Sequence, residues 1–342
     1  MRKIRVLVVE DSLVFRNLLV QGLNQDRALE VVATASDPFE ARDKIIEYRP
    51  DVMTLDIELP RMSGLEFLRK LMPQYPLPVV IISALSEKVF DAMKAGAVDF
   101  VAKPQVTERE QLRNFLCSEL PVKIKVASTA RVSRYKKPVA FAADQHLSVR
   151  SDIDIIAIGA STGGTEAIAE VIRDFSTDIP GTVIVQHMPP GFTEMYANRL
   201  DSQSRVKVKE AKNGDMVAPG QVLIAPGGSE HMSIVKVGDN YKVVLKKGEK
   251  VNGHCPSVDV LFNSVADVAG AHAKGIILTG MGGDGAKGLL KMQKNGARTI
   301  GQDEASCIVY GMPKVAYDLG AVMYQEKLSD IAKKTYTLLN QR

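Results

Sequence analysis

Short apolar segments alternate with amphipathic segments over the first 120 residues of the chain. The apolar segments have the length of β-strands, and each is followed by a stretch in which apolar residues recur at helical spacing. We predict strands at residues 4–9, 29–35, 51–56, 78–83 and 97–102, and helices near residues 13–24, 37–48, 64–72, 87–95 and 107–119. Five strand–helix repeats of this length predict an open parallel sheet with helices on both faces.

A second α/β pattern extends from residue 151 to residue 342, and it too predicts a mostly parallel, doubly wound sheet. Its expected strands are residues 153–159, 181–187, 275–280, 297–303 and 321–326. The segment 204–247 differs, because it holds four short β-rich runs with turn signals at Asn213-Gly214 and at residues 238–240. We therefore expect antiparallel hairpins beside the parallel sheet in this segment.

Between the two patterns, residues 121–150 lose the helical rhythm and become basic. They hold seven Lys or Arg residues and one acidic residue, so the formal net charge of +4 is concentrated there. We interpret residues 121–150 as a linker between one domain at 1–120 and another at 151–342. Since the rest of the chain is nearly neutral, a nucleic-acid-binding surface is not expected.

Composition narrows the class of protein further. Hydrophobic residues make up 45% of the chain, which is enough for two ordinary cores, and no apolar run is long enough to cross a membrane. The N-terminus lacks the pattern of a secretory signal, and the three cysteines match no metal-binding spacing. We expect a reduced, cytoplasmic protein that is not inserted in a membrane.

Polar residues follow the strands of the first domain, at the edge where a parallel sheet collects functional groups. They are Glu10 and Asp11 after the first strand, Asp56 at the end of the third, Ser83 at the end of the fourth and Lys103 after the fifth. Three converging carboxylates need a hard cation such as Mg²⁺ to limit their repulsion. A central aspartate could then accept a phosphoryl group whose oxygens bind Lys103 and Ser83.

The segments "VVEDS", "DVMTLDIELPRMSGLEFL", "IISALS" and "AGAVDFVAKP" resemble the two-component receiver domain. This resemblance implies a flavodoxin-like sheet in the order 2-1-3-4-5 and Asp56 as the phosphoryl acceptor. It also implies Mg²⁺ held by Glu10, Asp11 and Asp56, with Ser83 and Lys103 as switch residues. Phe100 stands where the family often has tyrosine, so the switch there is expected to work by packing alone.

In the second domain, Gly159-Ala160-Ser161-Thr162-Gly163 fits the Gly-x-Ser-x-Gly turn that presents a nucleophilic serine above a sheet. A phosphate-binding loop would need lysine where this chain has Thr165. His187 and Asp284 follow two other strands, so Ser161, His187 and Asp284 could assemble as a catalytic triad. The backbone N–H of Met281 could bind the oxyanion.

One alternative is a dinucleotide site, because Gly280, Gly282 and Gly285 have the literal Gly-x-Gly-x-x-Gly spacing after a strand. Asp284 would then lie beside a pyrophosphate and repel it. A receiver joined to a DNA-binding domain is a second alternative, but residues 151–342 show no recognition-helix pattern. A non-catalytic interaction module is a third.

The segments "IGASTGGTEA", "VIVQHMPPGFT", "HCPSVDVLF" and "ILTGMGGDGAKGL" extend the resemblance to the whole chain. They resemble the chemotaxis response-regulator protein-glutamate methylesterase family, whose members also act as protein-glutamine glutaminases. The resemblance implies the triad Ser161, His187 and Asp284, no cofactor for ester hydrolysis, chemoreceptor cytoplasmic helices as substrate and a chemotaxis histidine kinase as phosphodonor. Cys255 stands where the family often has arginine, so the sequence departs from the family at this position.

Overall fold

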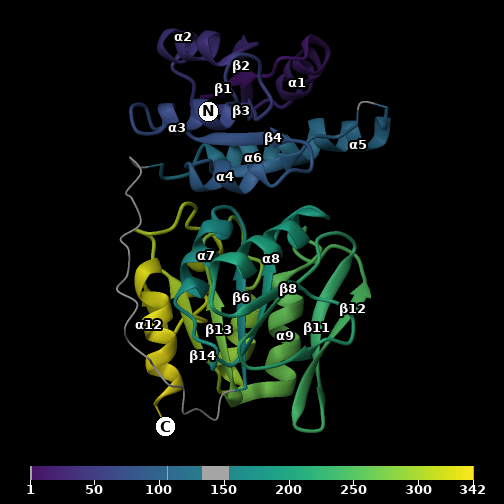
Figure 1. Ribbon diagram of the computed structural model, residues 1–342, viewed down its shortest axis with the longest axis vertical. Coiled ribbons are helices and arrows are strands. Elements are labelled where there is room, and N and C mark those ends of the chain that lie inside the picture. Colours follow the sequence, from purple (N-terminus) through teal and green to yellow (C-terminus); the bar gives the residue numbers. More distant parts are fainter. Residues whose placement is uncertain (1, 106, 133–153, 342) are drawn as a thin grey trace. The chain divides into compact units, whose positions relative to one another are not determined.

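A computed structural model divides the chain into two compact units, residues 1–139 and residues 140–342. It describes residues 2–105, 107–132 and 154–341. Each unit has its own parallel sheet with helices around it (Figure 1).

The sheet of the first unit has five parallel strands in the order β2-β1-β3-β4-β5, as expected for a receiver. The strands are β1 (Ile4–Val9), β2 (Leu29–Ala35), β3 (Val52–Asp56), β4 (Val79–Ser83) and β5 (Asp99–Ala102). The helices between them are α1 (Leu13–Gln25), α2 (Pro38–Tyr48), α3 (Gly64–Leu71) and α4 (Lys88–Lys94). Polar side chains start three of these helices, because Ser12, Asp37 and Ser63 each accept a hydrogen bond from a backbone N–H in the first turn.

The last helix of the first unit is longer than the sequence pattern predicted. It comprises α5 (Arg109–Asn114), a π-helical turn (Phe115–Glu119) and α6 (Leu120–Ala127). The prediction that residues 121–127 belong to a non-helical linker is therefore wrong. Leu120, Ile124 and Ala127 are fully buried, and Pro121, which has no N–H to donate, stands just after the π-helical turn, where the regular hydrogen-bond pattern is already interrupted. Residues 133–150 of the expected linker lie outside the described residues.

The main sheet of the second unit has seven strands in the order β15-β14-β13-β6-β7-β10-β8, and all its pairings are parallel. The strands are β6 (Ile155–Ala160), β7 (Gly181–Gln186), β8 (Lys207–Glu210), β10 (Gln221–Ile224), β13 (Ala273–Ile277), β14 (Arg298–Gln302) and β15 (Tyr324–Glu326). The helices are α7 (Gly164–Arg173), α8 (Phe192–Gln203), α9 (Val258–Ala269), α10 (Ala286–Lys294), α11 (Met312–Asp318) and α12 (Leu328–Leu339).

The expectation of antiparallel hairpins over residues 204–247 is only partly correct. β11 (Glu230–Val237) and β12 (Asn240–Lys247) do form a hairpin, which pairs with the short strand β9 (Met216–Val217). β8 and β10 instead extend the parallel sheet, and Asn213-Gly214 joins no pair of neighbouring strands. Short strands of this kind do not reveal from their sequence which partner they pair with, because both edges of a strand carry the same backbone groups.

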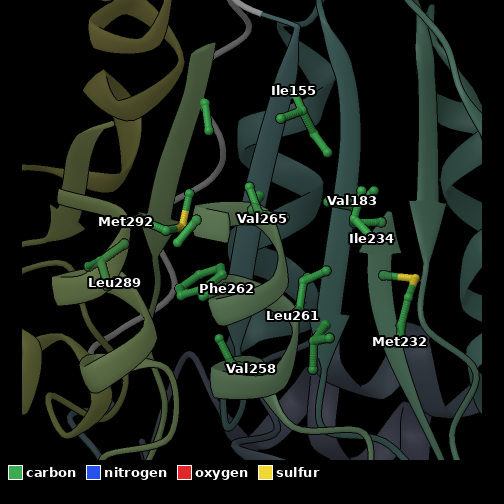
Figure 2. Close-up of a cluster of buried hydrophobic side chains, with 14 of the residues drawn as sticks. Ile155, Val183, Met232, Ile234, Val258, Leu261, Phe262, Val265, Leu289 and Met292 are labelled. Carbon is green, nitrogen blue, oxygen red and sulfur yellow. The ribbon is translucent and has the colours of Figure 1, made fainter. Parts of the chain in front are cut away.

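A hydrophobic core of the second unit lies between one face of the parallel sheet, helices α9 and α10, and the β11–β12 hairpin (Figure 2). Ile155 and Val183 come from the sheet, Phe262 from α9, Leu289 from α10 and Met232 from the hairpin. On the other face, α7 packs against α12. These layers hold the carboxyl ends of β6, β7 and β13 in fixed positions, and the candidate residues follow those ends.

Candidate functional site

In the first unit, the polar residues that follow the strands come together as predicted. The Lys103 Nζ donates hydrogen bonds to Glu10 Oε1 at 3.0 Å and Oε2 at 2.8 Å, and to Asp56 Oδ2 at 2.6 Å. Carboxylate oxygens of Glu10, Asp11 and Asp56 all lie within 4.8 Å of one another. Three hard oxygen donors at this spacing fit a divalent cation such as Mg²⁺.

The electrostatics of this cluster favour an added positive charge. Burial raises the pKa of Glu10 to about 7, and the charge of Asp56 acts in the same direction against the lowering effect of Lys103. Burial alone would lower the pKa of Lys103, but its bonds to Asp56 and Glu10 raise it, so the ammonium stays charged. One ammonium thus faces three carboxyl groups in a partly buried crevice.

Ser83 lies on β4, which pairs with the strand of Asp56, and Phe100 lies on β5, one strand further along the sheet. Ser83 is buried one residue beyond Ile82, the register partner of Asp56, and its carbonyl accepts the Lys103 N–H at 2.8 Å. Phe100 is only 4% exposed and meets Phe90 of α4 edge-on, with 6.3 Å between ring centroids. Any movement of the Phe100 ring therefore requires repacking against α4.

In the second unit, Ser161 directly follows β6 and precedes α7. Its side chain is buried, and Ser161 does not have the left-handed backbone that a strained nucleophile turn requires. That conformation belongs to Gly163, whose φ is +77°. The turn at Ser161 therefore differs from the strained turn that the Gly-x-Ser-x-Gly pattern forms in α/β-hydrolases. Glycine lacks a Cβ and adopts this φ at little cost, so the chain reverses two residues later.

The position of Ser161 in the sheet explains how distant residues reach it. In the sheet, β6 lies between β7 and β13. After β6 the chain first forms the strands on the β7 side, and it later forms β13, β14 and β15 on the opposite side of β6. Such a reversal opens a crevice at the carboxyl ends of the strands. His187 follows β7 and Asp284 lies in the loop after β13, so both border this crevice.

His187 and Asp284 are joined by a hydrogen bond of 2.8 Å between Nε2 and Oδ2. Asp284 also accepts bonds from the Ser257 Oγ, the Asn252 Nδ2 and the backbone N–H groups of Val258 and Asp259. Burial alone would raise the pKa of Asp284, but these donors together with His187 hold it well below its usual range.

An ionised Asp284 fixes the tautomer of His187. Because the carboxylate only accepts, the proton of the neutral ring lies on Nε2 and the lone pair lies on Nδ1. The Nδ1 atom is buried and has no hydrogen-bond partner among the described residues, Ser161 included. Hydrogen bonds of this kind are often unformed in ligand-free structures, and the free lone pair is what a general base needs.

Two further contacts hold this crevice together. The Gln186 Nε2 donates to the carbonyls of Ser161 at 2.9 Å and His187 at 3.1 Å, so one side chain ties both segments. Gly280 lies directly against Ser161, since a Cβ at Gly280 would come within 2.7 Å of the Ser161 Cβ. Met281 is the next residue, and its N–H has no backbone acceptor among the described residues.

Sequence reasoning missed two residues of the site, Asn252 and His254. Asn252 donates to Asp284, and the His254 ring stacks on the His187 ring with centroids 3.6 Å apart and an interplanar angle of 8°. The dipeptide Asn252-Gly253 is a strong turn signal that could have found them. Cys255 is next in the chain and half-buried, and burial raises the pKa of its thiol.

The Gly-x-Gly-x-x-Gly pattern does not form a nucleotide loop. Asp284 lies within it, and the carboxylate is turned toward donors of the protein rather than toward an open phosphate site.

Fold and site together define a class of protein. A receiver-type unit precedes a parallel α/β unit with serine, histidine and aspartate side chains at the carboxyl edge of its sheet.

Comparison with known families identifies the chain within this class. The CheB methylesterase family matches residues 156–335, and the response regulator receiver domain matches residues 6–116. The chain belongs to the CheB methylesterase family and carries the receiver domain at its N-terminal side. No helix among the described residues is both long and apolar enough to cross a membrane.

Two proteins match this chain over its whole length, and one solved structure matches about half of it. A protein-glutamate methylesterase/protein-glutamine glutaminase 2 of Syntrophomonas wolfei is 61% identical over 341 residues, which is 100% of this chain and 99% of that protein. A protein of Syntrophotalea carbinolica, named protein-glutamate methylesterase/protein-glutamine glutaminase, is 50% identical over 100% of this chain and 99% of its own length. The crystal structure of the Thermotoga maritima CheB methylesterase catalytic domain has 38% identity and a TM-score of 0.53, covering 54% of this chain and 98% of that one.

Proposed function

We propose that this chain is a protein-glutamate methylesterase that also acts as a protein-glutamine glutaminase, with chemoreceptor cytoplasmic helices as substrate. Hydrolysis of their glutamate methyl esters would give adaptation in chemotaxis. The observation that carries the proposal is the His187–Asp284 bond, which leaves the lone pair of the His187 Nδ1 without a partner among the described residues. The names of the full-length relatives indicate which acyl group the substrate carries, namely the side chain of a glutamate or glutamine residue in a protein.

In the proposed reaction the Ser161 hydroxyl attacks the ester carbonyl while the His187 Nδ1 takes its proton. Asp284 stabilises the imidazolium that forms, and the Met281 N–H binds the oxyanion. Methanol leaves with the proton that His187 returns, and water then attacks the acyl-enzyme and frees the glutamate. Glutamine follows the same path with ammonia as the leaving group. These steps use side chains and water and call for no cofactor.

The first unit would control the rate of this reaction, and the whole protein would act in the cytoplasm. A chemotaxis histidine kinase would donate a phosphoryl group to Asp56, and Lys103 and Ser83 would bind its oxygens. Glu10, Asp11 and Asp56 would hold Mg²⁺, which offsets the charge of the carboxylates and the phosphoryl group. Phe100 would then repack against Phe90 and pass the change to α4.

The experiment measures methanol release from membranes that carry methylated chemoreceptors. Ser161→Ala should reduce release to the uncatalysed level and leave Asp56 phosphorylation intact, because the two sites belong to separate units. Ser202→Ala, at an exposed serine of the same unit, serves as the control and should match the parent protein. A Ser161→Ala protein with the parent rate would remove Ser161 as the nucleophile, and a parent protein without methanol release would favour a non-catalytic module.

A further inference from the structure

A two-residue turn lies beside the His187–Asp284 pair. Val251 and His254 exchange two backbone hydrogen bonds of 3.0 Å, and Asn252 and Gly253 between them have φ values of +53° and +85°. Left-handed conformations at both central residues are typical of the tight type I′ turn, for which Asn-Gly is the favoured sequence. The turn therefore holds the two side chains that flank Gly253 in fixed directions.

Those two side chains contact the two residues of the catalytic pair. The Asn252 Nδ2 donates to Asp284 Oδ1 at 2.9 Å and to Asp259 Oδ2 at 2.7 Å. The His254 ring covers a face of the His187 ring at 3.6 Å between centroids, nearly parallel to it. One turn thus supports both the carboxylate and the imidazole.

The bond to Asp284 alone does not fix the plane of the His187 ring. A single hydrogen bond at Nε2 still allows the ring to tilt about the bond, and a tilt changes the direction of the Nδ1 lone pair. A parallel ring over one face removes that freedom. It also places a π-system against the positive charge that His187 gains when it takes the serine proton.

We propose that His254 is a positioning residue for the reaction, which holds the His187 ring by stacking so that Nδ1 meets the Ser161 hydroxyl. The proposal rests on the proposed function, because it assigns His187 as the general base. The proposed role depends only on the flat aromatic face of His254, so another aromatic ring at this position should also stack on His187 and hold it.

The test compares His254→Ala with His254→Phe in the full-length protein. His254→Ala should lower kcat for methanol release about tenfold or more with KM for the receptor changed less than twofold, because the ring acts on the base and not on binding. His254→Phe keeps a ring for stacking and should restore most of kcat. His272→Ala, at an exposed histidine of the same unit, is the matched control and should behave as the parent.

Two additional measurements make the result decisive. Thermal unfolding of each variant shows whether a loss of rate comes from a loss of fold. Labelling of Ser161 by a fluorophosphonate reports activation of the serine without any receptor, so an error in the proposed substrate is seen apart from an error in the role of His254. The proposal is overturned if folded His254→Ala labels and turns over like the parent, or if folded His254→Phe is as slow as His254→Ala.

Discussion

Asp284 illustrates how individual residues define the site. Both of its carboxylate oxygens face N–H donors: Oδ2 faces His187 and Val258, and Oδ1 faces Asn252 and Asp259. An asparagine here cannot place its NH₂ group on either side without a donor–donor contact. The carboxylate therefore has two roles, one in holding the His187 tautomer and one in joining the surrounding loops.

We expect Asp284→Asn to lower the rate of methanol release by about 10⁴-fold, as in other triads where the base loses its carboxylate. It should also destabilise the second unit by about 1–3 kcal/mol, because buried donors lose their acceptor. Initial rates and chemical denaturation of the same protein preparation measure both effects. A variant with the parent rate would contradict the assignment of Asp284.

Lys274 of β13 is a second residue with a measurable signature. Its side chain is only 3% exposed, and burial, together with the charge of Arg298, lowers its pKa to about 8. Between about pH 8 and the ordinary lysine pKa near 10.5, the unfolded chain binds more protons than the folded chain. The burial of charged Lys274 therefore lowers the free energy of unfolding by its full amount below about pH 8, and this penalty disappears as the pH rises from about 8 to about 10.5.

Lys274→Met should stabilise the second unit at pH 7, by at most roughly 3 kcal/mol. The gain should shrink between pH 8 and pH 10.5, because the parent lysine becomes neutral there. Urea denaturation at pH 7 and at pH 10 gives the two free energies of unfolding. Lys333→Met, at an exposed lysine of α12, should show no such pH dependence, and an equal shift in both variants would contradict the explanation by burial.

At the scale of elements, the hydrophobic pattern predicted most of the fold. Continuous buried strands such as β3 and β4, separated by capped amphipathic helices, indicate parallel α/β units from sequence alone. The pattern failed where local signals were weak. The strand β10 has only four residues, and its partner depends on the tertiary arrangement. In α6, Pro121 and two lysines concealed a helix whose buried face is carried by Leu120, Ile124 and Ala127.

The site was predictable to a similar extent. Ser161, His187 and Asp284 each follow a strand, so the topology rule for parallel sheets led us to group them, and the structure joins His187 to Asp284. Asn252 and His254 come from a turn that follows no strand of the parallel sheet, and no periodicity indicates which side chains such a turn presents. The role of the Gln186 amide could not be predicted from the sequence either, because its two carbonyl acceptors, on Ser161 and His187, are brought near it only by the folded sheet.

The assignment of α6 to the first unit can be tested by one matched pair of variants. Ile124→Ala should destabilise the first unit by about 2–5 kcal/mol, because it leaves a cavity at a fully buried position. Val122→Ala, two residues earlier in the same helix, should have little effect because Val122 is 54% exposed. Calorimetry of the full chain should show the change only in the transition of the first unit. Equal, small effects of both variants would mean that α6 contributes nothing to that core.

At the scale of the whole molecule, the chain joins two kinds of chemistry. The first unit holds three clustered carboxyl groups beside a lysine, and the second holds a buried serine and a histidine that is hydrogen-bonded to an aspartate. In the proposed account, phosphorylation of Asp56 shifts an equilibrium between a slow and a fast form of the enzyme. Raising the fast form from about 1% to about 50% requires only ~2.7 kcal/mol, which a charged group and its new ion pairs can supply.

The most direct test is the rate of methanol release by the full-length protein before and after addition of acetyl phosphate and Mg²⁺. We expect a rise of about ten- to fiftyfold in the parent protein. Asp56→Asn should keep the low basal rate with no response, and Ser161→Ala should give no release in either condition. A parent protein that does not respond, or an Asp56→Asn protein that responds like the parent, would contradict the claim that Asp56 controls the chemistry of Ser161.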